Sequence, residues 1–219
     1  MNFKRITRNS VALAIATVVA VAGIAVAGPP PGKGKKPKPP PPPPPTEEPE
    51  PDPDPAPTYN AVDVEFVNMM IPHHFQATVM GQLAASRAGS EDVRALAERI
   101  EIEQVVEIGM MQNWQNWNAL SVTNAPMAYE MMLGNPMMLE MMGMASPAQM
   151  AALEASSGAA FDQLYLELMI THHQGALRML VNVLTNGTNT TMEFWATDML
   201  TAQTQQIEVM QAMLADSAA

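Results

Sequence analysis

The stretch FVNMMIPHH, residues 66–74, returns 99 residues further along the chain as YLELMITHH, residues 165–173. The correspondence continues without a gap, so that residues 63–114 align with residues 162–213. A repeat of this length indicates a supersecondary unit that is used twice. The sequence therefore predicts one domain assembled from two copies of a single structural template.

Apolar residues within each copy recur with the spacing of an α-helix. At 100° per residue, the first segment of the first copy places its apolar stripe within about 80° of arc. This stripe contains Phe66, Met70, His73, Ala77 and Met80. The second segment has an equivalent stripe of Val93, Ala97, Gln104, Ile108 and Met111. Each copy is therefore expected to fold as an amphipathic helical hairpin.

Local signals place the ends of these helices. Gly89-Ser90-Glu91-Asp92 provides a break, an N-cap and acidic first-turn residues, and Asn186-Gly187 marks the matching turn. Ser146-Pro147-Ala148-Gln149 has the pattern of a capping box with proline at the first helical position. We expect helices near residues 60–86, 91–118, 147–185 and 190–215, with the third broken near Ser156-Ser157-Gly158. The predicted fold is an all-α four-helix bundle with repeats 60–118 and 159–215.

The first 58 residues differ in composition from this domain. Residues 1–27 have a basic start and an apolar run that ends in Ala25-Val26-Ala27, which predicts a cleaved secretory signal peptide. A retained membrane anchor is the alternative, although the apolar run is only just long enough to span a bilayer. Residues 28–58 are rich in proline and charge and predict a disordered linker, with a stiff spacer at Pro39–Pro45. The four-helix domain is expected to occupy residues 59–219.

Charge and sulfur content restrict the function of the domain. Residues 59–219 contain four arginines, no lysine and 17 acidic residues, a formal charge of −13. Such a surface disfavours nucleic acid and attracts cations, although acidity could also serve solubility alone. The chain has no cysteine but 21 methionines, so thioethers are its soft sulfur ligands.

All four histidines of the chain occur in the two His-His pairs. Because adjacent helical residues point about 100° apart, His73 and His172 should face the interior while His74 and His173 lie at the bundle edge. One interpretation is structural: His73 and His172 would be core residues that bond to Gln104 and Gln203. The other is a metal site, because each pair belongs to a Met-x-x-His motif.

The Met-x-x-His motif differs from that of di-iron bundles, which use Glu-x-x-His on two helices and further glutamates on the others. Here sulfur stands at the carboxylate position, and Glu107 is replaced by Gln206 in the second copy. Imidazole with thioether is a soft to borderline ligand set. The motif therefore favours Cu(I) over Fe(III) or Zn²⁺.

A methionine-rich insertion, residues 121–146, separates the repeats. Gly134-Asn135-Pro136 should divide it into two short helices, and we expect a flexible arm rather than a part of the bundle. Methionines four residues apart, such as Met137 and Met141 or Met138 and Met142, would meet on one helical turn. Two functions remain open: an arm that captures Cu(I) or Ag(I), and an irregular apolar cap.

The two His-His segments, each followed by a Gln-x-x-x-Ile helix, resemble the domain of unknown function 305 family over about residues 60–215. That family is ferritin-like and includes exported copper-binding proteins. The resemblance implies a periplasmic or extracellular copper binder in metal tolerance, with ligands among the His-His pairs and the methionines near them. The chain departs from the family pattern at Phe75, where the second copy has Gln174, and in its long insertion.

These observations predict an exported protein that sequesters or hands on Cu(I), with Ag(I) and Cu(II) as alternative cargo, and that has no catalytic residues. Its partners would be metal ions and another copper-trafficking protein, not nucleic acid, and a membrane only if the signal is retained. Two rival functions are a metal-dependent oxidase or ferroxidase built from the same His-His pairs with Glu107 and Gln104, and a helical interaction module on a proline-rich stalk. The candidate metal ligands are Met70, His73, His74, Met80, Met111, Met169, His172, His173, Met179, Met210, Met137, Met138, Met141 and Met142.

Overall fold

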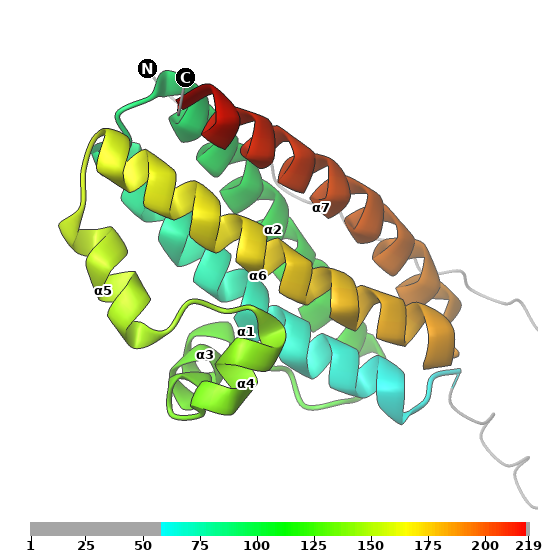
Figure 1. Ribbon diagram of the computed structural model, residues 1–219. Helices are drawn as coiled ribbons and strands as arrows, with labels where there is room; N and C mark the ends of the chain where they lie inside the picture. Colours follow the sequence, from blue (N-terminus) through cyan, green and yellow to red (C-terminus); the bar gives the residue numbers. More distant parts are fainter. Residues whose placement is uncertain (1–57, 218–219) are drawn as a thin grey trace, which may run out of the picture. The chain divides into compact units, whose positions relative to one another are not determined.

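The computed structural model describes residues 58–217, and all regular structure within that range is helical. Four long helices form the body of the domain (Figure 1): α1 (Ala61–Arg87), α2 (Glu91–Trp117), α6 (Ala159–Asn186) and α7 (Thr190–Ser217). Three short helices connect its halves: α3 (Ala125–Leu133), α4 (Pro136–Met142) and α5 (Pro147–Ala155). The predicted all-α class is confirmed, whereas the predicted signal peptide and nearly all of the linker lie outside the described residues.

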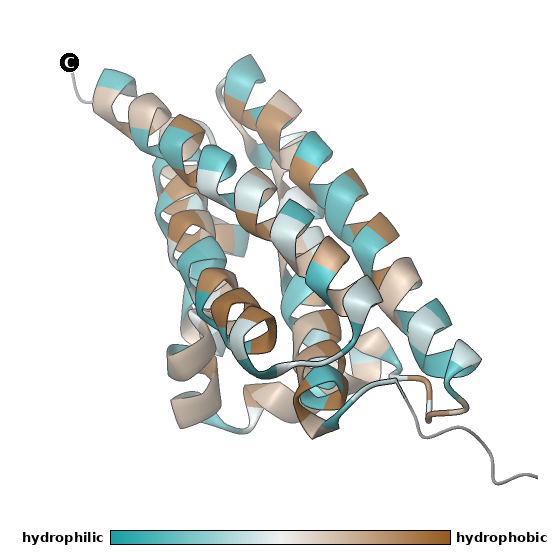
Figure 2. Ribbon diagram, turned by 90° about the vertical axis from the view of Figure 1, so that its right-hand side faces the viewer, coloured by the Kyte–Doolittle hydropathy of each residue, from teal (hydrophilic) through white to brown (hydrophobic). Residues whose placement is uncertain are grey.

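The long helices form two hairpins, as the repeat predicts. Helix α1 packs against α2, α6 packs against α7, and the hairpins meet where α1 lies along α6. Hydrophobic and hydrophilic residues alternate along each long helix (Figure 2), as expected for helices that bury one face. Within residues 58–217, none of the helices is both long and apolar enough to cross a membrane.

The helix ends follow the local signals in the sequence. Ser146 and Gln149 form the expected capping box, in which the Ser146 backbone N–H donates to Gln149 Oε1 at 2.8 Å. The predicted long third helix is interrupted as expected, because Gly158 adopts a left-handed φ of 62° between α5 and α6. Ser90 caps α2 through its side chain. Short-range chemistry thus sets most helix boundaries.

A repeated aspartate ties each hairpin to the other. Asp63 at the start of α1 accepts hydrogen bonds from the backbone N–H groups of Thr188 (3.0 Å) and Asn189 (3.2 Å) in the α6–α7 turn. Its counterpart Asp162 at the start of α6 accepts from Gly89 (2.9 Å) and Ser90 (2.8 Å) in the α1–α2 turn. Because each carboxylate satisfies backbone donors at the foot of the opposite hairpin, the two copies dock reciprocally.

The core of the bundle consists of two apolar clusters with a polar layer between them. Along α1, buried His73 lies between Met70 of one cluster and Ala77 of the other. Along α2, buried Gln104 lies between Ile100 and Ile108 in the same way. The second copy repeats this arrangement with His172 and Gln203. The polar layer is therefore formed by equivalent residues of all four long helices.

The methionine-rich insertion packs on the bundle, so the prediction of a flexible arm is wrong. Its two short helices form where Gly134-Asn135-Pro136 predicts the break, but one side of them is buried against α1 and α6. Tyr129 and Met142 belong to a buried cluster with partly buried Phe75 of α1. The other side faces solvent and includes Met137, which is 80% exposed. The insertion is therefore an amphipathic cap, with one face buried on the bundle and another that exposes methionines to solvent.

The return segment of the insertion, residues 141–145, lies unusually close to α6. A Cβ atom on Gly175 would lie 1.6 Å from the carbonyl oxygen of Met142, so only glycine fits there. Gln76 of α1 fixes the same segment, because its amide group donates to Ala145 O at 2.8 Å and accepts from Ala145 N at 2.7 Å. Gln76 stands at the repeat position of Gly175. The two copies thus use different residues at one position to hold the insertion.

Candidate metal centre

The four histidines meet in the polar layer at the middle of the bundle. The rings of His73 and His172 stack with centroids 3.7 Å apart and planes 28° apart. Within each pair the centroids are 6.1 Å apart for His73 and His74, and 6.0 Å apart for His172 and His173. All four side chains are fully buried.

The predicted inward direction of His73 and His172 is therefore confirmed, but the predicted edge position of His74 and His173 is wrong. Residues of α2 and α7 cover the second histidine of each pair. Glu107 of α2 contacts His74, and Gln206 of α7 contacts His173. A helix that has neighbours on more than one side can bury two adjacent residues.

Every histidine Nε2 atom faces an oxygen that can only accept a hydrogen bond. The Nε2 of His73 lies 3.1 Å from Met142 O, and that of His172 lies 2.9 Å from His73 O. The predicted bonds to Gln104 and Gln203 are therefore wrong. The backbone carbonyls bonded instead have no proton to give, so the proton of each ring resides on Nε2.

Of the outer histidines, His173 follows the same rule, whereas Nε2 of His74 contacts Glu107 without forming a hydrogen bond among residues 58–217. The Nε2 of His74 lies 2.8 Å from Glu107 Oε2, and that of His173 lies 2.7 Å from Gln206 Oε1. The amide of Gln206 is oriented by its own N–H donation to Glu103 Oε2 at 2.5 Å, because a carboxylate only accepts. The rings of His73, His172 and His173 therefore carry their lone pair on Nδ1.

None of the four Nδ1 atoms has a hydrogen-bond partner among residues 58–217, although all are buried. The side-chain oxygen of Gln104 and the amide of Gln203, in the same layer, are also unpartnered within this range. Buried polar groups are normally hydrogen-bonded, so this concentration needs an explanation. Metal-binding histidines characteristically donate their second ring N–H to an oxygen acceptor such as a carbonyl, which is the arrangement of His73, His172 and His173.

The environment keeps the imidazoles of His73, His172 and His173 neutral. Burial, with the repulsion of His172 second, holds the pKa of His73 well below its usual range. Burial likewise lowers the pKa of His172, with the repulsion of His173 as the next cause. Burial lowers the pKa of His173 to about 4, even though its bond to Gln206 acts in the opposite direction. The neutral, unprotonated Nδ1 is the form that ligates a metal.

Within residues 58–217, no three His, Asp or Glu side chains are arranged to hold a metal ion by themselves. The predicted methionine ligands Met70, Met80, Met111, Met169 and Met210 are fully buried in the apolar clusters on either side of the histidine layer. Hard ions prefer oxygen ligands, but among residues 58–217 Glu107 is the one carboxylate that contacts a histidine. The histidine layer thus lies between two apolar clusters that both contain methionines.

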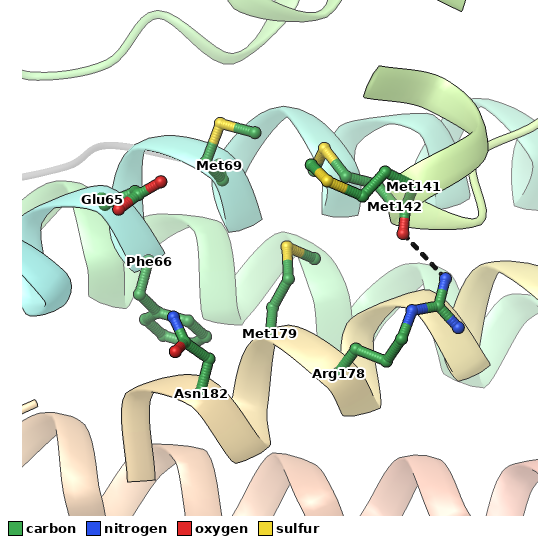
Figure 3. A pocket seen from close by; sticks show the side chains of 8 residues that line it. All are labelled: Glu65, Phe66, Met69, Met141, Met142, Arg178, Met179 and Asn182. Atoms are coloured by element: carbon green, nitrogen blue, oxygen red, sulfur yellow. Dashed lines mark hydrogen bonds between the residues drawn. The ribbon is translucent and has the colours of Figure 1, made fainter. Parts of the chain in front are cut away.

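A second group of sulfur atoms surrounds a cavity of about 300 Å³ between α1, α4 and α6 (Figure 3). Its walls contain the predicted ligands Met141, Met142 and Met179, together with Met69, which the sequence argument missed. Met69 was missed because Leu168 occupies its repeat position. Of the remaining candidates, Met138 packs within the insertion's own cluster and Met137 is exposed to solvent.

Comparisons with known proteins agree with the predicted resemblance. The family model described as a domain of unknown function (DUF305) matches residues 63–214. A DUF305 protein from Streptomyces coelicolor, described as secreted, is 31% identical with a TM-score of 0.63, covering 72% of this chain and 94% of its own. A DUF305 fragment from Deinococcus radiodurans is 28% identical with a TM-score of 0.65, covering 73% and 99%.

CopM in its Cu(II)-bound form is 31% identical to this chain with a TM-score of 0.59, covering 70% of this chain and 96% of that protein. The search of curated proteins found no match. Because the family model spans more than half of the sequence and the four-helix architecture is shared, the chain belongs to the DUF305 family.

Proposed function

We propose that this chain is an exported copper-binding protein that sequesters or hands on Cu(I) in metal tolerance, with Ag(I) and Cu(II) as further cargo. The observation that carries this proposal is the set of four buried histidine Nδ1 atoms, none of which has a hydrogen-bond partner among residues 58–217. CopM, which shares the fold, is described in Cu(I)-bound, Cu(II)-bound and Ag-bound forms. Copper is the cargo of the site rather than a resident cofactor.

The donor set favours a soft ion. Buried methionines flank the histidine layer on both sides, and the imidazoles of His73, His172 and His173 are held neutral. Thioether and imidazole ligands suit Cu(I) and Ag(I), whereas Ca²⁺ and Mg²⁺ require several oxygen ligands. Since neutral Nδ1 atoms have no proton to lose, cargo can bind at neutral pH without proton release.

The same residues support storage rather than catalysis. Glu107 contacts His74, but the equivalent position carries Gln206, so the second copy offers an amide where a di-iron oxidase needs a carboxylate. We therefore propose that the protein has no catalytic residues and acts by holding the ion. Its acidic domain and apolar leader sequence support function outside the cytoplasm, with metal ions and a copper-trafficking protein as partners.

The test replaces the stacked histidines with glutamine. Glutamine can keep an N–H donor near the position of histidine Nε2, toward Met142 O and His73 O, but it has no Nδ1 lone pair. We expect His73→Gln with His172→Gln to weaken Cu(I) binding at least about tenfold, measured by competition with a colorimetric chelator under reducing conditions. Oxygen uptake on adding Cu(I) should stay at the rate of buffer alone.

Tyr165→Phe is the matched control, because it alters another fully buried polar ring on α6 without removing a nitrogen. Its Cu(I) affinity should equal that of the unaltered protein. Equal affinity in the histidine double variant would contradict the proposed centre, and rapid oxygen uptake would favour the oxidase instead.

A further inference from the structure

We propose that Met69, Met141, Met142 and Met179 form a second cation site, the thioether pocket, which captures a soft monovalent ion from solvent. The proposal relies on the proposed function for the class of cargo, but it concerns a place apart from the histidine layer. Its four sulfur atoms come from α1, α4 and α6, so the insertion completes a site that the two repeats lack by themselves.

The geometry brings the four thioethers around one space. In Figure 3 the side chain of Met179 rises from α6 between Met69 on α1 and the adjacent Met141 and Met142 on α4. Met142 is 1% exposed whereas Met141 is 60% exposed, so the cavity has a buried wall and an open side. A cation can therefore reach sulfur atoms here without opening the bundle.

The wall that carries two of these methionines is held in place. Arg178 of α6 donates to Met141 O at 2.8 Å and to Gln174 O at 3.2 Å, which joins the end of α4 to α6. The close contact of Gly175 with Met142 O fixes the same point. A site whose backbone is fixed before binding loses less entropy when the ion enters.

The charges around the pocket are compatible with a monovalent cation. Glu65 lies in the wall together with Arg178, so the carboxylate offsets the guanidinium charge. The domain as a whole carries a formal charge of −13, which raises the local concentration of cations. The net environment is therefore not repulsive to a singly charged ion.

The ligand chemistry selects the kind of ion. Four neutral thioethers suit Cu(I) and Ag(I), but they contribute little to Zn²⁺ and are poor ligands for Mg²⁺ or Ca²⁺. No histidine or aspartate lines the cavity, and Glu65 is the one carboxylate among its lining residues. The pocket is thus narrower in specificity than a site built on imidazoles.

Met142 connects the pocket to the histidine layer. Its side chain lines the cavity, while its carbonyl oxygen accepts the Nε2–H of His73 at 3.1 Å. An open sulfur site therefore adjoins a fully buried imidazole site, with one residue in common.

The experiment uses the full chain labelled with ¹³C at the methionine methyl groups and titrated with silver nitrate. The methyl signals of Met69, Met141, Met142 and Met179 should shift together within two equivalents of Ag(I), because the histidine centre can take one of them. Zinc chloride should leave them in place, and a zinc-induced shift would contradict the proposed selectivity. Scattered shifts among exposed methionines, with the four pocket signals unmoved, would overturn the site.

A variant set makes the test independent of the histidine centre. Met69→Leu, Met141→Leu and Met179→Leu together should lose one equivalent of Ag(I) by calorimetry, because leucine keeps the volume but not the sulfur. The matched control is Met127→Leu, Met131→Leu and Met137→Leu, three exposed methionines of the same insertion, which should lose none. The thioether pocket is refuted if the pocket variant binds as many equivalents of Ag(I) as the unaltered protein, or if both variants lose the same number.

The His73→Gln, His172→Gln protein separates the two proposals. It should keep the methyl shifts of the thioether pocket while losing the tight Cu(I) site. If this variant still binds Cu(I) tightly, the histidine centre is wrong. If its pocket methyl signals do not shift with Ag(I), the thioether pocket is wrong. If the leucine variant does not fold, as judged by circular dichroism, the methyl shifts of the unaltered protein decide.

Discussion

Tyr165 is a buried polar residue outside the histidine layer that shows how the two copies have diverged. Its hydroxyl group has no hydrogen-bond partner among residues 58–217, and burial, followed by the charge of Glu101, raises its pKa. Phe66 occupies the equivalent position and is also buried. An unpartnered buried hydroxyl costs about 1–3 kcal/mol.

Tyr165→Phe should therefore increase the free energy of unfolding by about 1 kcal/mol, because it removes an unpartnered hydroxyl and leaves the ring. Urea denaturation of the metal-free protein, followed by circular dichroism, measures this change. A decrease in stability would mean that the hydroxyl is hydrogen-bonded in solution, for example to a buried water molecule.

The histidine residues show where single-residue reasoning succeeds and where it stops. Helical periodicity correctly placed His73 and His172 inside the bundle, because that inference needs only the apolar stripe. It misplaced His74 and His173, since their burial depends on Glu107 and Gln206, which lie more than 30 residues away in the sequence. Contacts between helices are not encoded in the periodicity of either one.

The insertion is the element that most distinguishes the structure from a plain four-helix bundle. Its return segment lies so close to α6 that a Cβ atom at residue 175 would overlap Met142 O, and Gly143 there adopts a φ of 69°. Displacing this segment would break the His73–Met142 hydrogen bond and open the thioether pocket. The packing of one element thus supports both candidate sites.

Gly175→Ala should lower the free energy of unfolding by about 2–3 kcal/mol, because the new methyl group forces the return segment away from α6. Limited proteolysis should then cut residues 121–146 faster than in the unaltered protein. Gly109→Ala in α2 is the control: nothing lies within 4 Å of its added methyl group, and it should stabilise the helix by about 0.5–1 kcal/mol. Equal effects at the two glycines would refute the proposed close contact.

Element boundaries were predictable where the signal is local. The capping box at Ser146 and the interruption at Gly158 depend on a few adjacent residues, and both occur as expected. The docking of the insertion was not predictable, because Gln76 bonds to Ala145, 69 residues later, and no neighbouring residue signals that bond. For the same reason Met69 could not be assigned to the thioether pocket from the sequence.

At the scale of the whole molecule, the two repeated hairpins form a symmetric frame, and the insertion, which occurs once, adds the proposed second site. Asp63 and Asp162 dock the two hairpins in equivalent ways, and the contacts of His74 with Glu107 and of His173 with Gln206 are also equivalent. The insertion covers only one side of this frame, where Met142 bonds to His73. A repeat with one added element can therefore hold a buried imidazole centre and a separate sulfur pocket.

The buried histidines also determine how the whole metal-free protein responds to acid. His73, His172 and His173 have pKa values lowered by burial, so in the folded protein they stay neutral below the usual histidine value of 6.5. In the unfolded chain they take up protons near that value, so the unfolded state binds more protons and folding stability must fall as the pH falls. Each of these histidines lowers the free energy of unfolding by up to about 1.4 kcal/mol per pH unit below about 6.5.

The loss should continue toward pH 4, where His173 also becomes protonated in the folded state. Urea denaturation of the metal-free protein at pH 7, 6 and 5 measures the slope, and His173→Gln should reduce it by about one third, because one of three titrating groups is removed. Above pH 7 both states are neutral at these residues, so stability should be flat there. A profile that is equally flat between pH 7 and 5 would mean that the folded protein protonates its histidines as readily as the unfolded chain, and the neutral Nδ1 lone pairs required for copper would then be absent.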